Sequence, residues 1–439
     1  MPTDRASAPP ARRARSAGGA GLFLLALAAT AALAGCAGWE ASPSQSRAAA
    51  AAPAPSRDAL PLEEATLQLA MATLQVADLP PRPGGGPHPL VIDPLIDRAT
   101  GTETNATRSM VRQIEALVRD RLPQYELRPF TLASLDAQPL ILLGSITTVT
   151  GAGSLTNATG PTDTYRIWAV LADLRSGRIL SHPTAWVRAE TVDATPVRFF
   201  RDSPVWMPDE ARAAYLRTCA GNPGDPVDPA YLRMLRAQAA VTEAIRAYEE
   251  GRPERALALY RTAAEEPGGL EQQRVLNGLY LANAALGRRR EAEAAFARLV
   301  DFGLAWDRLA VKLLFRPGST EFPRDPAISG PYPMWLRQIA TRADARSACL
   351  KVTGHASVTG TPEGNDRLSL ARARRVEARL VAQAPRLDGR IRAEGLGARQ
   401  PLIGIGTDDL RDALDRRVEF APLACPGLTA EGERPAAGG

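Results

Sequence analysis

The chain has 439 residues, of which 45% are hydrophobic and 23% charged, and this composition is typical of an exported globular protein with two to four domains. Its formal charge is +5, and loss of the four arginines and one aspartate within residues 1–35 would lower that charge by three, to +2. So small an excess gives little support to nucleic-acid binding, because neutralising a phosphate backbone needs many basic groups.

An arginine-led apolar run over residues 18–34 ends in the sequence Leu-Ala-Gly-Cys at Cys36. It has the parts of a secretory signal and is too short and too rich in small residues for a good membrane span. Its end resembles a lipobox, which implies cleavage after a signal peptide of residues 1–35, lipidation of Cys36 and, because Ala37 follows, release to the outer membrane. The alternative is an internal cysteine after an unprocessed apolar helix.

The small and proline-rich residues of 36–60 cannot bury enough apolar surface to fold, so we expect a disordered tether from the membrane. The sequence of 61–202 then alternates helical and strand-like patterns. We expect helices over 62–75 and around Met110–Leu122, and strands over 89–97 and from Tyr125, Leu140 and Tyr165. Their order and length resemble the envelope lipoprotein domain shared by the flagellar protein FlgO, the curli pore CsgG and the synthase activator LpoB, which implies an α/β sandwich.

Catalytic patterns are not found in this region. His88 and His182 each lie beside a proline, with neither a nearby cysteine nor a Ser-centred elbow or HExxH spacing. Asp93 and Asp97 at the end of a strand suit either acid–base work or capping of the turn, and we favour capping. Residues 151–160 contain glycines but lack a phosphate-binding lysine, so we interpret them as a hairpin loop. We therefore predict no enzyme activity, no cofactor and no metal site.

Residues 203–235 are interpreted as a turn-rich linker, in which Cys219 is either a free thiol or paired with a partner. An internal repeat follows within 236–303. Four positions recur after 36 residues: Tyr248, Gly251, Ala256 and Tyr260 as Ala284, Gly287, Ala292 and Phe296. The helix pairs resemble tetratricopeptide units, and two units are too few to stand alone, so they should pack against the C-terminal domain. They form either a protein-binding face or a structural spacer.

Residues 354–380 contain a strand end, a glycine-containing loop and an arginine-rich helix. The helix sequence includes Leu368, Ser369, Arg372, Ala373, Val376 and Leu380, preceded by Asn365. This pattern resembles the OmpA C-terminal domain, which binds peptidoglycan. Residues 314–322 resemble the first strand and turn of that family, and 414–420 its last strand. The resemblance implies a βαβαβ domain over 309–425, followed by a disordered tail of 426–439. The expected fold class is thus multidomain α+β.

The resemblance implies that a strand-end aspartate binds the ammonium of diaminopimelate, while Arg372 binds a carboxylate of the same peptide stem. Here Ser357 replaces that aspartate. Losing one charge-assisted hydrogen bond costs roughly 1 kcal/mol or more, about a tenfold loss of affinity. Glu363 or Asp366 on the same loop is a candidate to supply the missing charge. The predicted peptidoglycan-binding residues are Ser357, Asn365, Leu368, Arg372 and Arg416.

Cys349 and Cys425 lie near opposite ends of this domain, and an oxidising periplasm favours a disulfide between them. We therefore predict a periplasm-facing outer-membrane lipoprotein that tethers or scaffolds the envelope by binding peptidoglycan. The alternative is an accessory regulator or assembly component whose N-terminal domain binds an envelope protein, with wall binding lost or weakened by Ser357. The repeat helices are a second candidate surface for an envelope protein partner.

Replacing the lipobox cysteine, Cys36→Ser, should block lipidation and remove the protein from the outer-membrane fraction. Fractionation and metabolic labelling with palmitate measure this. Unchanged labelling and fractionation of the variant would contradict the anchor.

Overall fold

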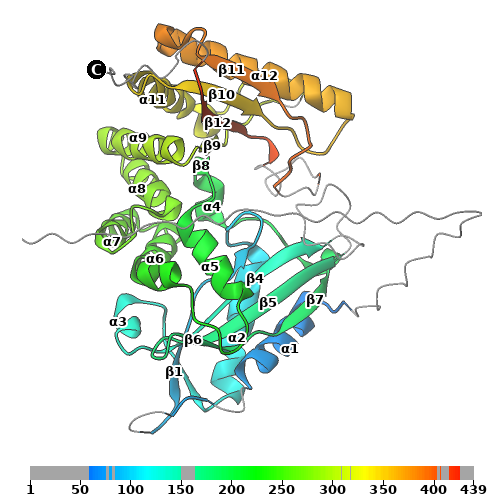
Figure 1. Ribbon diagram of the computed structural model, residues 1–439, viewed down its shortest axis with the longest axis vertical. Helices are drawn as coiled ribbons and strands as arrows, with labels where there is room; N and C mark the ends of the chain where they lie inside the picture. The colour runs from blue at the N-terminus through cyan, green and yellow to red at the C-terminus, as the bar shows by residue number, and fades with distance from the viewer. Residues whose placement is uncertain are drawn as a thin grey trace, which may run out of the picture. The chain divides into compact units, whose positions relative to one another are not determined.

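The computed structural model describes residues 59–75, 79–81, 85–149, 164–307, 309–316, 318–402, 406 and 415–425 (Figure 1). The predicted signal peptide, Cys36, nearly all of the tether, the loop 151–160 and the tail 426–439 lie outside these ranges. Among the residues it does describe, no helix has the length and apolarity to cross a membrane. The same ranges contain no group of three metal-ligating side chains.

The N-terminal part is built on a mixed sheet with the strand order β3-β1-β4-β5-β6, in which β2 also pairs with β4, and β7 with β5. The strands are β1 His88–Ile92, β2 Ile96–Asp97, β3 Tyr125–Leu127, β4 Leu140–Val149, β5 Thr164–Asp173, β6 Arg178–Ser181 and β7 Thr184–Arg188. Strand β1 runs parallel to β3 and β4, whereas β4 and β5 form a long antiparallel pair. The strand-like runs predicted from the sequence therefore do form strands.

Helices cover both faces of this sheet. On one face lie α1 (Leu62–Leu74) and α2 (Asn105–Arg121); on the other lie α3 (Leu132–Leu135), α5 (Glu210–Ala220) and the first half of α6 (Pro229–Glu249) (Figure 1). Alternate residues of β4 enter the two cores, Leu142 on the first side and Ile141 and Leu143 on the second. Burial on both faces explains why these strands are almost continuously apolar.

The structure differs from the expected linker at 203–235. This segment holds β8 (Val205–Trp206), all of α5 and the start of α6, because the second face of the sheet needs helices to cover it. Asp209 caps α5 by accepting a hydrogen bond from the backbone N–H of Arg212 at 2.8 Å. Cys219 is a free thiol buried in that core, where burial raises its pKa well above the ordinary value.

The middle of the chain is helical and contains two hairpins, α6 with α7 (Pro253–Glu265) and α8 (Gln273–Ala285) with α9 (Arg289–Ala305). The repeated glycines, Gly251 and Gly287, follow α6 and α8 with φ of +72° and +66°. In both, the next residue donates to a carbonyl five positions back, so each hairpin turns through the same glycine-dependent cap. The repeated Tyr260 and Phe296 are both fully buried.

The C-terminal sheet has the order β11-β10-β12-β9-β8. Its strands are β9 Leu309–Val311, β10 Cys349–Gly354, β11 Ile391–Gly395 and β12 Val418–Leu423, with helices α10 Pro326–Ser329, α11 Tyr332–Ala345 and α12 Pro362–Gln383. Short segments complete the fold: α4 Arg198–Asp202 and the 3-10 turns Ala189–Thr191 and Pro385–Leu387. Within the expected domain of 309–425 the first strand is β9, so the strand expected within 314–322 is wrong; the described residues of that segment form a turn.

One continuous hydrophobic core joins the helical hairpins to the C-terminal sheet, as expected for two repeat units that are too few to stand alone. At its centre Trp335 of α11 stacks on Phe296 of α9, with ring centroids 5.5 Å apart, and donates to the Tyr280 hydroxyl at 3.0 Å. The buried face of α12 differs in part from the expected one. Leu368 and Ala371 are only half-buried, while Ser369 and Ala373 are fully buried.

A close backbone contact explains that difference. A Cβ on Gly354 at the end of β10 would lie 2.2 Å from the Ser369 carbonyl oxygen, so glycine allows α12 to lie directly on the strand end. Only small side chains fit on the helix at such a distance. The contact sets the height of α12 above the loop that carries Ser357.

Cys349 at the start of β10 and Cys425 after β12 are joined in a disulfide; they are 76 positions apart in sequence and their Cα atoms are 5.2 Å apart. Replacing both cysteines with alanine should lower the free energy of unfolding by about 2–4 kcal/mol, because the unfolded chain loses a long closed loop. Urea unfolding of protein made in the periplasm measures the loss. Reductant should bring the wild type to the level of the variant, and two free thiols in wild-type mass mapping would refute the pairing.

Asp97 caps its turn as expected, accepting from the backbone N–H and hydroxyl of Thr100 at 2.8 and 2.9 Å. Asp93 does not cap the turn. It is buried between sheet and α6, where its carboxylate accepts a 2.8 Å hydrogen bond from the Tyr231 hydroxyl. Burial raises the pKa of Asp93 from 3.8 to about 7.

This raised pKa gives a pH-dependent contribution to stability. The contribution is full below the unfolded pKa near 4 and is lost as the pH rises through about 7, because the folded state holds the proton longer. Asp93→Asn should remove this loss, so the variant should gain stability relative to wild type between about pH 4 and pH 7.5, on the order of a few kcal/mol. Urea midpoints at the two pH values measure it, with Asp120→Asn on the exposed face of α2 as control. A parallel pH dependence in wild type and Asp93→Asn would contradict the assignment.

Candidate functional site

The loop after β10 is held in place by the first turns of α12. Thr361 caps the helix by accepting from the backbone N–H of Gly364 at 3.1 Å. One turn further, the Asn365 side chain donates to the carbonyl oxygens of Ser357 at 3.2 Å and Thr359 at 2.8 Å. The Ser357 hydroxyl lies 3.1 Å from that of Thr359. Two of the predicted site residues, Ser357 and Asn365, are therefore brought together.

A buried polar cluster supports the same loop from the side of β12. The backbone N–H of His355 donates to the Arg417 carbonyl at 3.0 Å, and the His355 ring lies 3.8 Å from the Glu419 carboxylate. Arg417, 1% exposed, pairs with Glu419 at 2.7 Å and donates to the Gln400 carbonyl at 3.3 Å. Asp415, also buried, accepts from the backbone N–H of Leu402 at 2.6 Å. These contacts tie the ends of β10, β11 and β12 into one rigid edge.

Arg372 lies two helical turns beyond Asn365 and is 4% exposed. Its guanidinium stacks over the Phe315 ring at 5.0 Å and donates to the carbonyl oxygens of Ser319 at 3.2 Å and Arg316 at 3.5 Å. These contacts hold the 316–321 turn, which closes on itself through Arg316 and Glu321. Arg372 is thus fixed by packing as well as charge, and such preorganisation suits recognition of a carboxylate in one orientation.

The missing strand-end acid is not replaced by a free carboxylate of Asp366. That side chain forms an ion pair with Arg399, with nitrogen–oxygen distances of 2.7 and 2.6 Å. Glu363 is exposed in the first turn of α12. The position that a family aspartate would occupy is instead filled by the uncharged Ser357, which is 5% exposed.

The remaining predicted residues flank this arrangement. Leu368 is half-buried on α12 between Asn365 and Arg372, and Arg416 is half-buried two residues before β12. Sequence reasoning gave no role to His355, Arg417 or Glu419, although all three stand inside the quoted motifs. It also missed Phe315 as the ring beneath Arg372, because 314–322 was interpreted partly as a strand.

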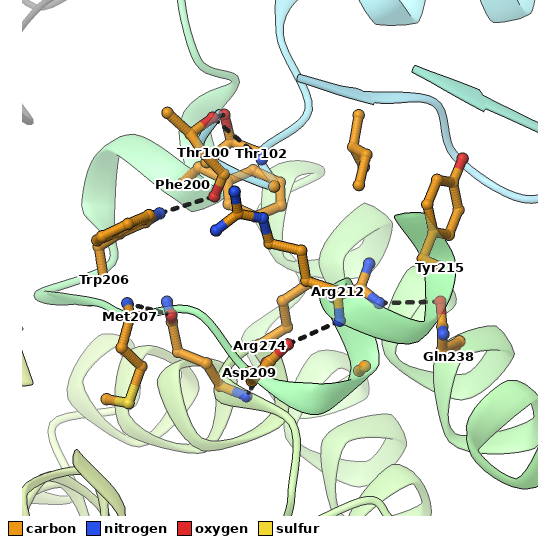
Figure 2. A pocket seen from close by; sticks show the side chains of 14 residues that line it. Thr100, Thr102, Phe200, Trp206, Met207, Asp209, Arg212, Tyr215, Gln238 and Arg274 are labelled. Atoms are coloured by element: carbon orange, nitrogen blue, oxygen red, sulfur yellow. Dashed lines mark hydrogen bonds between the residues drawn. The ribbon is translucent and has the colours of Figure 1, made fainter. Parts of the chain in front are cut away.

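A second polar region lies where α5, α8 and the Thr100 turn meet (Figure 2). Here the Trp206 indole donates to the Thr100 carbonyl at 2.7 Å, and Arg212 donates to the carbonyls of Arg98 and Ala99 at 2.6 and 2.7 Å. The cavity between these side chains measures about 40 Å³, room for little more than a water molecule. We interpret it as a structural junction and not as a ligand site.

The OmpA family matches residues 314–413 of this chain. No curated protein matches it. Solved structures similar to the chain include the cell wall anchor of the T6SS from Pseudomonas aeruginosa, with 25% identity over 29% of this chain and 96% of that one and a TM-score of 0.24. The peptidoglycan-associated lipoprotein from Burkholderia pseudomallei gives 23% identity over 25% and 88%, with a TM-score of 0.22. An outer membrane protein from Borrelia burgdorferi B31 gives 22% over 27% and 88%, with a TM-score of 0.21.

The family match covers the turn below Arg372, β10 with the loop that follows it, the whole of α12 and β11, whereas β9 and β12 lie outside it. Residues 314–413 are therefore an OmpA family domain, which implies peptidoglycan binding in the cell envelope. The mixed sheet and the helical hairpins that precede it lie outside the matched residues.

Proposed function

We propose that this protein anchors the cell envelope by binding the peptide stem of peptidoglycan through its C-terminal domain. The observation that carries the proposal is Arg372, buried on α12 within the matched OmpA family residues and held rigidly over Phe315. In this proposal Arg372 binds a carboxylate of diaminopimelate, while the loop of Ser357 and Asn365 receives its ammonium. Leu368 and Arg416 flank the stem.

Because Ser357 is uncharged, we expect the site to bind the ammonium of the stem weakly. A hydroxyl and backbone carbonyls accept from an ammonium, but without an opposite charge each bond contributes less than a charge-assisted one. A polymer that presents many stems compensates for a weak single contact. Attachment of the same chain to the membrane through its lipid also keeps the domain at high local concentration near the wall.

The proposed attachment is the lipid on Cys36, joined to the folded part by the tether of 36–60. Two attachments, one to the outer membrane and one to the wall, define a tether. The FlgO-like sheet domain and the tetratricopeptide-like hairpins then serve as a scaffold between them, and binding of an envelope protein partner to the hairpins is the accessory function that would remain if wall binding were absent.

Restoring the acid tests the site directly. Ser357→Asp should strengthen co-sedimentation of the unlipidated chain 37–439 with purified sacculi by about tenfold, the size of one charge-assisted bond. Gln383→Asp, exposed in the last turn of α12 and far from the loop, is the charge-matched control and should change binding little. Equal gains in both variants would indicate general electrostatics and contradict the site.

Arg372 needs a conservative change because its guanidinium also holds the 316–321 turn. Arg372→Lys keeps the charge but loses the planar fork, so we expect binding about tenfold weaker, with a similar melting temperature. Arg379→Lys, exposed on the same helix, is the control. Wild-type binding that is indifferent to Arg372→Lys would refute the inherited site.

A further inference from the structure

A cleft of about 500 Å³ lies in the N-terminal part, beyond the carboxyl ends of β1 and β3 and between α2 and α6. Its apolar lining comes from both strand ends and both helices: Ile92, Val111, Leu127, Phe130 and Ile245. Clefts of this size at the carboxyl edge of parallel strands are common places for ligands. The wall-binding domain contributes no residue to it.

At the inner end of the cleft the charged side chains are paired with one another. Arg108 of α2 forms ion pairs with Glu103 at 3.1 Å and with Glu249 of α6. Glu249 also accepts a 3.1 Å hydrogen bond from the backbone N–H of Phe199. These groups join α2 to α6 and to the start of α4, so they have a structural role.

The rim has a different charge balance, because the whole lining holds five arginines against three glutamates. Arg112 on α2 and Arg246 on α6 are exposed, and across the described residues neither side chain has an ion-pair or hydrogen-bond partner. Arg119 pairs with the nearby Glu115 on its own helix at 3.2 Å. Such an exposed pair is worth only about 0–1 kcal/mol, so a ligand carboxylate can replace it.

The spacing of these arginines selects the shape of the ligand. Arg112 and Arg119 are seven residues apart on one face of α2, which places them about 10 Å apart along the helix. A single phosphate cannot reach both. A peptide in the polyproline II conformation has three residues per turn and advances about 3.1 Å per residue, so carboxylates three residues apart lie on one face and about 9 Å apart, which matches this distance. The two intervening side chains point to either side of that face, toward the apolar lining that α2 and α6 contribute.

We propose that this cleft binds an extended peptide segment of a partner protein with the pattern acid–apolar–apolar–acid. Arg112 and Arg246 supply the unpaired guanidinium groups, and Arg119 exchanges Glu115 for a ligand carboxylate. The site is separate from the peptidoglycan site and does not depend on wall binding. It also specifies which kind of peptide segment an envelope partner of the N-terminal part would present.

The test uses fluorescent, acetylated hexapeptide pools with the central pattern Glu-Φ-Φ-Glu, where Φ is Leu, Ile, Val or Phe, and matched pools with Gln in place of Glu. Chain 37–439 should bind the Glu pool at least about tenfold more tightly than the Gln pool, with affinity falling as salt rises. Arg112→Gln and Arg246→Gln should each remove most of this preference.

Arg121→Gln is the matched control, since Arg121 is exposed on the same helix but does not line the cleft. Equal binding of the two pools to wild type would overturn the proposal, as would an equal loss in Arg121→Gln. Inorganic phosphate is added as a competitor of the bound Glu pool. Displacement of the Glu pool by phosphate at equal concentration would assign the cleft to a free anion and overturn the peptide assignment. None of these measurements involves sacculi, so failure here and failure of wall binding are distinguishable.

Discussion

The pairing of the two-residue strand β8 with β9 is the contact on which the arrangement of the described chain depends. Val205 and Trp206 lie opposite Val311 and Ala310 at the edge of the C-terminal sheet. The Val205 carbonyl also accepts from the side chains of Gln273 at 2.8 Å and Asn277 at 3.0 Å on α8. Because Trp206 reaches back to the Thr100 turn, two residues connect the N-terminal sheet, the hairpins and the OmpA family domain.

This edge strand has consequences for the OmpA family domain. It covers the exposed side of β9, which would otherwise present unpaired backbone groups to other chains. The adjoining core is shared with α9 through Phe296 and Trp335, so the domain is completed by residues that precede it in sequence. Measurements on wall binding therefore need the chain that includes β8. The β8–β9 pairing and the shared core also hold in place the sheet that carries the loop around Ser357.

The sequence predicted the parts of the fold that local patterns determine. The two-residue alternation of β10, the periodicity of α2 and the repeated glycines after α6 and α8 each depend on neighbours in the chain, and each appears in the structure. The segment 203–235 could not be assigned in the same way. Its turn-forming residues make turns only between α5 and α6. Strand β8 and helix α5 form because distant residues supply a sheet edge for β8 and a sheet face for α5.

The candidate site shows the same division. The motif located Asn365 and Arg372 because their spacing is fixed along one helix. It could not show that Asp366 is bound by Arg399, that Phe315 lies beneath Arg372, or that His355, Arg417 and Glu419 brace the loop, because those contacts join segments up to about sixty residues apart. The sequence likewise could not show that the arginines of the cleft between α2 and α6 lie together, because they come from separate segments of the chain.

The central claim is that the OmpA family domain of this chain still binds a diaminopimelate stem although Ser357 stands in place of an acid. The most direct measurement is co-sedimentation of the wild-type chain 37–439 with purified diaminopimelate-containing sacculi, with and without soluble stem tripeptide as competitor. We expect weak, saturable sedimentation that the tripeptide reverses. Sedimentation that the tripeptide leaves unchanged, or no sedimentation at all, would contradict it.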